Sequence, residues 1–126
     1  MEKLIIDRSK WRTGSGGKFS TGTGDTALRN GQGFMCCLGF EALRLKFDEH
    51  DIIDVGEPCD IPGNPEFHNN RFVSDAIGIN DNTATTLEEK EKKLVPLFAT
   101  EGIELQFINE PIINHEESTE DISPTI

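Results

Sequence analysis

The sequence of 126 residues has no tyrosine, one tryptophan and only three cysteines, of which Cys36 and Cys37 adjoin. An odd number of cysteines does not suggest a disulfide framework, and it is typical of a chain kept in a reducing compartment. Zinc sites usually space paired cysteines by two to four residues, so that both sulfurs reach one ion. We therefore expect Cys36 and Cys37 to be buried structural side chains, and we expect neither a metal nor a cofactor.

Long apolar runs are also lacking. No stretch approaches the roughly 20 apolar residues that span a bilayer, and residues 1–7 are too short and too acidic for a signal peptide. The sequence therefore predicts no contact with a membrane and a location in the cytoplasm. The length fits one domain, which we place at residues 1–109 and follow with an acidic tail at residues 110–126.

Positive charge is scarce outside the N-terminal part. Residues 1–30 carry six basic and three acidic side chains, a balance of +3, whereas residues 31–126 carry six basic and twenty acidic ones, a balance of −14. The sum is the net charge of −11. Phosphate contacts need Lys and Arg, so this charge argues against direct binding of nucleic acid. An acidic surface attracts a basic protein surface instead.

Recognisable catalytic patterns are missing too. No serine lies in the sequence of a nucleophile elbow, and no histidine lies near a candidate nucleophile. We therefore expect that the protein is not an enzyme.

The apolar pattern of the first half predicts one strand and one central helix. Residues 4–6 are a short apolar run bounded by charge, which is typical of a strand. Residues 34–47 are apolar or small apart from Lys46 and a polar stripe at helical spacing, formed by Glu41, Arg44 and Asp48. This pattern predicts a largely buried helix, with Cys37 and Leu38 in the core. Residues 52–55 favour a short strand.

The second half predicts two helices and a closing strand. Residues 71–79 favour a short helix that ends near Gly78, followed by a turn at residues 80–82. Thr86 and Glu89 match a capping box at the start of the next helix, whose geometry must change at Pro96. Residues 103–107 alternate between apolar and polar side chains, as in a half-buried strand. The predicted fold is α+β: a small sheet with the first and last strands packs on the central helix and a C-terminal helix.

The basic part of the chain contains a glycine-rich arm at residues 12–26. A phosphate-binding P-loop needs a glycine, four residues and then Gly-Lys-Ser/Thr. Here Phe19 follows Gly17 and Lys18, and Arg12 stands where the first glycine is needed, so the match fails. A looser anion site for a nucleotide remains an alternative to a plain surface loop. Its candidate residues are Arg12, Gly14, Gly16, Gly17 and Lys18.

An acidic, proline-containing loop at residues 48–70 is the other unusual segment. It holds seven carboxylates and no Lys or Arg, and its three prolines exclude a long helix. Like charges gathered in this way repel one another, so stability explains them poorly. A solvated acidic face is the plain interpretation, and a site for a partner that supplies positive charge is the functional one. The candidate partner-binding residues are Asp48, Glu49, Asp51, Asp54, Glu57 and Asp60.

One distinctive motif is Met35-Cys36-Cys37-Leu38-Gly39-Phe40, which continues as Glu41-Ala42-Leu43. With residues 7–12, 26–28, 30–31, 33–34, 79–81 and 98–107, it resembles a family of small uncharacterised proteins from bacteriophages and prophages. The resemblance covers about residues 1–108 and carries no catalytic residue over. It implies a viral origin and the cytoplasm of an infected bacterium.

Two functional hypotheses follow from these patterns. In the first, the protein is a phage accessory protein that inhibits a host defence system stoichiometrically, in the manner of an anti-CRISPR, by binding a basic, nucleic-acid-binding surface of a host protein. In the second, the glycine-rich arm sequesters an anionic nucleotide second messenger. Self-association into a homo-oligomer stays open.

Overall fold

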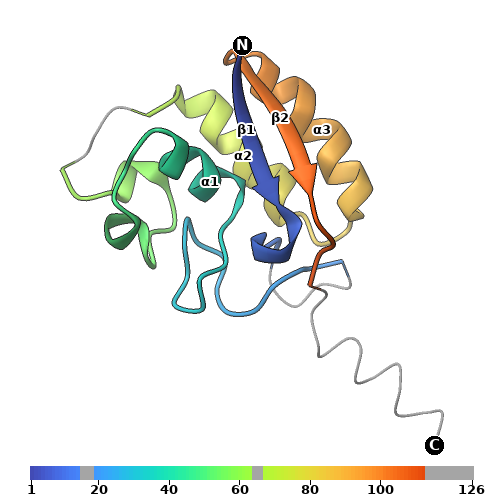
Figure 1. Cartoon of the computed structure of the whole chain (residues 1–126), viewed down its shortest axis with the longest axis horizontal. Helices are drawn as coiled ribbons and strands as arrows, with labels where there is room; N and C mark the ends of the chain where they lie inside the picture. Colours follow the sequence, from blue (N-terminus) through green and yellow to red (C-terminus); the bar gives the residue numbers. More distant parts are fainter. Residues whose placement is uncertain (15–18, 64–66, 113–126) are drawn as a thin grey trace, which may run out of the picture.

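The computed structural model describes residues 1–14, 19–63 and 67–112, and these form an α+β fold (Figure 1). Strand β1 (Glu2–Asp7) pairs in parallel with strand β2 (Ile103–Ile108), so the first and last elements lie side by side. Helices α1 (Cys37–Arg44), α2 (Asn70–Asp81) and α3 (Leu87–Ala99) lie between them in the chain. Three short 3-10 helices complete the described elements: η1 (Arg8–Lys10), η2 (Glu49–Ile52) and η3 (Pro58–Asp60).

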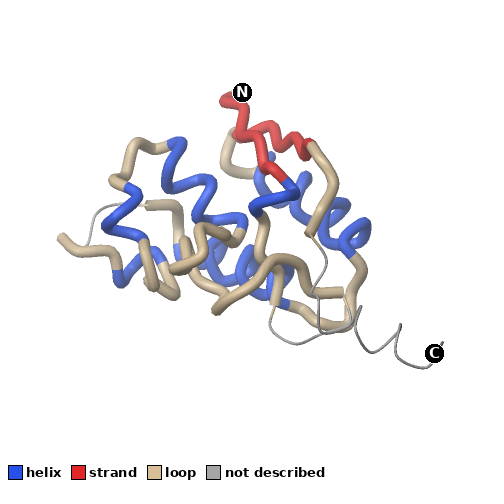
Figure 2. The backbone as a smooth tube through the Cα atoms, turned by 60° about the horizontal axis from the view of Figure 1, so that its bottom comes forward, coloured by secondary structure: helices blue, strands red, loops and turns tan. Residues whose placement is uncertain are grey.

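The two strands have one buried and one open face, as period-two alternation requires. Leu4 and Ile6 of β1 and Ile103 and Leu105 of β2 are buried, whereas the residues between them are exposed. Figure 2 places both strands at one margin of the molecule, with the helices on one side of them. The predicted sheet of first and last strands is therefore confirmed.

Helix α1 lies in the core, as predicted, but is shorter than residues 34–47. Cys37 and Leu38 are fully buried, which confirms their predicted place. The helix does not begin earlier because Met35 forms backbone hydrogen bonds with a distant segment. Its N–H donates to the Lys10 carbonyl, and its carbonyl accepts from the Arg12 N–H, both at 2.8 Å. The helix stops at Arg44 because Lys46 adopts a left-handed conformation with φ of 75°.

Close approach explains one glycine of α1. A Cβ atom at Gly39 would lie 1.8 Å from the Leu28 carbonyl oxygen. The helix therefore rests directly on the backbone at residue 28, which only glycine allows.

Helix α2 is longer than predicted and passes through Gly78 and the expected turn. Its last turn is held by Asn80, which is fully buried. The Asn80 side-chain oxygen accepts hydrogen bonds from the Trp11 indole N–H at 2.7 Å and from the Cys37 backbone N–H at 3.1 Å, and its amide donates to the Arg12 carbonyl at 3.0 Å. These tertiary bonds outweigh the local preference of Asn-Asp-Asn for a turn.

Helix α3 begins with the predicted capping box. The Thr86 hydroxyl accepts from the Glu89 N–H at 3.2 Å, and the Glu89 carboxylate accepts from the Thr86 N–H at 2.8 Å. Pro96 does not end the helix, which continues to Ala99 and closes with N–H bonds from Thr100 to the carbonyls of both Pro96 and Leu97. Gly102, with φ of 77°, then turns the chain into β2.

Candidate partner-binding site

The acidic segment, residues 48–60, is folded differently from the predicted strand at residues 52–55. It contains η2 and η3 instead, and Ile53 makes only an isolated bridge with Arg29. The short helix forms because the Asp48 carboxylate caps it, accepting from the His50 N–H at 2.8 Å. All six predicted partner-binding carboxylates lie on this segment and all are exposed: Asp48, Glu49, Asp51, Asp54, Glu57 and Asp60.

Backbone and apolar contacts fix the acidic segment to the body of the protein. The N–H of Leu28 donates to the Val55 carbonyl at 2.8 Å, and the N–H of Asp54 donates to the Arg29 carbonyl at 2.7 Å. Ile52 is fully buried, and Pro58 is buried in η3. The carboxylates therefore project from a backbone that is already fixed. Binding a partner then costs little conformational entropy of this backbone.

Within the described part of the chain, none of these six carboxylates forms an ion pair with a Lys or Arg. The Asp48 carboxylate lies 3.1 Å from Nδ1 of His50. Hydrogen bonds from the backbone and the ring of His50 hold the pKa of the Asp48 carboxyl below its usual value. Negative charge on this surface is thus largely uncompensated by basic side chains of residues 1–14, 19–63 and 67–112.

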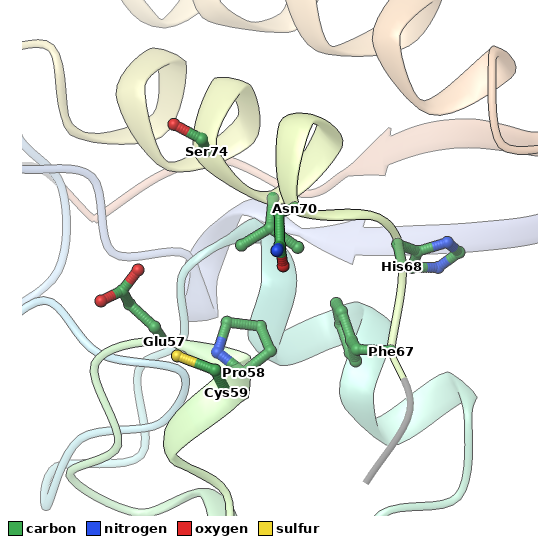
Figure 3. A pocket seen from close by; sticks show the side chains of 8 residues that line it. Glu57, Pro58, Cys59, Phe67, His68, Asn70 and Ser74 are labelled. Carbon is green, nitrogen blue, oxygen red and sulfur yellow. The ribbon is translucent and has the colours of Figure 1, made fainter. Parts of the chain in front are cut away.

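A hollow of about 420 Å³ opens between the acidic segment and α2 (Figure 3). Glu57, Pro58 and Cys59 come from the acidic segment, and Phe67 and His68 come from the chain that leads into α2. Asn70, Val73 and Ser74 complete the lining from the first two turns of α2. The lining thus combines the apolar side chains of Pro58, Phe67 and Val73 with the exposed carboxylate of Glu57.

His68 is held in its place by carboxylates on both sides. Its Nε2 lies 2.6 Å from Glu41 Oε2 and its Nδ1 lies 2.9 Å from Glu101 Oε1. With a carboxylate within hydrogen-bonding distance of each ring nitrogen, the ring is held from two sides, and we interpret it as a structural tie.

The buried carboxylate that anchors this tie is Glu41, which is fully buried in α1. Arg44 donates to it from two nitrogens, at 2.6 and 2.7 Å, in a bidentate pair. The sequence placed Glu41 on a polar stripe with Arg44 and Asp48. In the structure, the Glu41 side chain of this stripe is buried and not exposed to solvent. The cluster links α1, the entry to α2 and the end of α3, and so fixes one wall of the hollow.

Three exposed groups of the acidic segment lie close enough to share a cation. Ligand atoms of Glu57, Cys59 and Asp60 all lie within 4.8 Å of one another. Partial desolvation, then the charges of Asp60 and Glu57, raise the pKa of the Cys59 thiol above its ordinary value, which disfavours the thiolate that binds metals. We assign no metal to these groups, because exposed acidic side chains commonly gather without one.

The two other cysteines lie in the core and not at a site. Burial raises the pKa of the Cys36 thiol to about 12 and that of Cys37 well above its ordinary value. Both therefore stay protonated at neutral pH, as expected of structural side chains.

The alternative anion site is described only in part. Arg12 is buried, and its guanidinium donates to the carbonyls of Gly24 at 2.7 Å and Thr21 at 2.9 Å. Gly14 has φ of 65° and is buried. The remaining candidates, Gly16, Gly17 and Lys18, lie outside the described residues. Two of the guanidinium N–H groups that an anion would bind are thus used to hold the fold of the arm.

Sequence reasoning missed the residues of the hollow other than Glu57. No periodicity connects Phe67 and His68 with Val73, because they meet only where the acidic segment turns back against α2. One signal was present: Asn69 caps α2, accepting from the Phe72 N–H at 2.8 Å, and so fixes where His68 must lie.

No family model matches the chain, and no curated protein or solved structure shows significant similarity to it. None of the helices in residues 1–14, 19–63 and 67–112 is both long and apolar enough to cross a membrane. The function is therefore inferred from the residues and their geometry.

Proposed function

We propose that this protein works by binding a basic surface of a partner protein through the acidic segment and the adjoining hollow. The observation that carries the proposal is that six exposed carboxylates stand on a held backbone without a Lys or Arg partner among the described residues. Such an arrangement costs free energy through self-repulsion, and a partner that brings positive charge relieves that cost.

The charge of the segment supports fast and salt-sensitive binding. Complementary potentials speed the encounter of two proteins, and salt screens them over a Debye length of about 8 Å at physiological ionic strength. Each exposed pair contributes only about 0.2–1 kcal/mol, so several carboxylates must act together to give useful affinity.

The hollow supplies the anchor that charge alone lacks. An Arg or Lys side chain of the partner can lay its apolar stem against Pro58, Phe67 and Val73 and direct its charge to Glu57. Binding energy in protein interfaces concentrates in such buried anchors, among which Arg is enriched.

The class of partner we propose is a host protein with a nucleic-acid-binding groove. The basic lining of such a groove matches the acidic segment, and occupation of the groove would exclude nucleic acid. This is the action expected of a stoichiometric, anti-CRISPR-like inhibitor encoded by a phage and working in the host cytoplasm.

Neutralisation of the acidic segment tests the proposal. The variant carries Asp51→Asn, Asp54→Asn, Glu57→Gln and Asp60→Gln. A control with the same change in net charge carries Asp25→Asn, Asp75→Asn, Glu88→Gln and Glu104→Gln, all at exposed positions outside the segment. Capture from lysate of the infected host, at low and high salt, identifies partners, and titration then measures affinity.

We expect the neutralised segment to weaken binding of a basic partner at least tenfold and to flatten its salt dependence, whereas the control keeps both. Ala substitution of Phe67 should weaken binding without changing the salt dependence. Equal binding by the neutralised variant and the control would refute the proposal.

A further inference from the structure

The outer edge of β1 is an unpaired row of backbone groups. The N–H of Glu2 donates to the Gly102 carbonyl at 3.0 Å, and Glu2 is in register with Ile103. In a parallel ladder the even-numbered residues of β1 therefore point their backbone groups at β2, and the odd-numbered residues point them away. Among the described residues, no hydrogen bond fills the outward groups of Lys3 and Ile5. An edge of this kind is a template for another strand.

The sheet is also unusually small for its type. Parallel strands normally occur in larger sheets that are covered on both faces, and two strands alone are marginally stable. Here the sheet has two strands, and its open face leaves Ile5 46% and Ile108 42% exposed. A further strand would satisfy the outer edge of β1 and cover part of this apolar surface.

The odd-numbered residues of β1 make the edge complementary to itself. They read Lys3, Ile5 and Asp7 along the strand. When two copies meet antiparallel with Ile5 opposite Ile5, each Lys3 stands opposite the Asp7 of the other copy. Lys3 and Ile5 carry the open outward backbone groups, so Ile5 meets Ile5 as a hydrogen-bonded pair in that register, while Asp7, which caps η1, meets Lys3 through its side chain.

We propose that two copies of this chain pair through β1, antiparallel and about a two-fold axis at Ile5, to form a continuous four-stranded sheet. The order of strands is β2, β1, β1 of the second copy and β2 of the second copy. Cross-strand contacts of Ile5 with Ile5 and of Lys3 with Asp7 stabilise the pair.

The charges favour this one arrangement over others. Parallel pairing would set each odd-numbered residue of one copy opposite an even-numbered residue of the other, because only one residue of a parallel pair points its backbone groups across, so Lys3 would not meet Asp7. A shift by two residues would leave Lys3 opposite Ile5 and remove the ion pairs. Lys3 forms no ion pair with another described residue, and Asp7 accepts its hydrogen bonds through Oδ1, so Oδ2 remains for the second copy.

Net repulsion opposes the dimer, because each copy carries a charge of −11. Salt screens this repulsion more than it weakens closely paired charges, so association is best measured near physiological ionic strength. Sedimentation equilibrium of the whole chain is expected to give a mass twice 14.0 kDa at high micromolar concentration.

Charge exchange tests the register. Lys3→Glu places two carboxylates opposite each other, so we expect at least a tenfold weaker dimer, whereas Lys93→Glu, at an exposed lysine of α3, keeps it. Asp7→Lys places two lysines opposite each other and should also give monomers. An equimolar mixture of Lys3→Glu and Asp7→Lys chains restores both opposite-charge pairs and should form a mixed dimer.

Three results would overturn the proposal: a wild-type chain that stays monomeric up to about 1 mM, a Lys3→Glu chain that dimerises as tightly as wild type, or a mixture that stays monomeric although both variants are folded by circular dichroism. If Asp7→Lys fails to fold through loss of its capping role, the comparison of Lys3→Glu with Lys93→Glu still decides.

Discussion

At the scale of single residues, Gly39 and Gly78 occupy two helices but play opposite roles. Gly39 faces the Leu28 carbonyl so closely that a methyl group would lie 1.8 Å from it, while a methyl group at Gly78 would meet nothing within 4 Å. The first glycine is required by packing, and the second only weakens its helix.

Gly39→Ala should therefore destabilise the protein by at least about 1–3 kcal/mol, because α1 has to move off the backbone beneath it. Gly78→Ala, the matched control, should stabilise the protein by about 0.5–1 kcal/mol, since alanine is the better helix former. Chemical denaturation measures both. A Gly39→Ala chain as stable as wild type would show that α1 does not rest on residue 28.

The hollow shows at the same scale what the sequence could reveal. Glu57 was predicted because it belongs to a visible run of carboxylates. His68 was not, because its contacts with Glu41 and Glu101 span 27 and 33 residues and follow no local period. The burial of Glu41 was equally hidden: a Glu–Arg pair three residues apart is typical of an exposed helix face, and only His68 shows why it lies inside.

At the scale of elements, Asp7 joins three of them. It ends β1, caps η1 by accepting from the Ser9 N–H at 2.9 Å, and accepts from Asn109, just after β2, at 2.9 Å. The hydrogen bonds from Ser9 and Asn109 lower the pKa of the Asp7 carboxyl below its ordinary value of 3.8.

A lowered pKa means that ionised Asp7 stabilises the folded state above pH 3.8, and that this contribution is lost as the pH falls through the folded-state pKa. Asp7→Asn removes the charge and keeps a capping side chain. At fixed protein concentration, wild type should be the more stable protein at pH 6, and the two unfolding curves should converge as the pH drops below 3.8. A gap between them that is constant down to acid pH would contradict this role.

Elements with a strong local signal were predicted well, and elements set by tertiary contacts were not. The capping box of α3 and the alternation of β2 are local patterns, and both are confirmed. The length of α1 depends on Met35 pairing with a distant segment, and the length of α2 depends on Asn80 bonding to Trp11. Both contacts join residues far apart in the sequence, so the local sequence pattern of a helix does not reveal them.

At the scale of the whole molecule, the net negative charge opposes the stability of the fold. The net charge is −11, and the acidic segment concentrates part of it where the described residues offer no Lys or Arg as partner. Self-repulsion of this kind destabilises the compact state.

The variant with Asp51, Asp54, Glu57 and Asp60 neutralised should therefore melt at the same temperature as wild type or slightly higher, in thermal unfolding at low salt. The gain should shrink as salt is added, because screening removes the repulsion that the substitutions relieve. A clearly lower melting temperature would show that these carboxylates support the fold, and loss of binding by the same variant would then need another explanation.

The pairing of β1 with β2 also determines when the protein can fold. Residues 2–7 leave the ribosome before their partner strand at residues 103–108, which follows about a hundred residues later. At about 5–20 residues per second, the first strand waits roughly 5–20 s for its neighbour. During that time Leu4 and Ile6 have no sheet to enter, so the nascent chain exposes an apolar strand that chaperones can bind, and the core closes only after nearly all of the domain has been made.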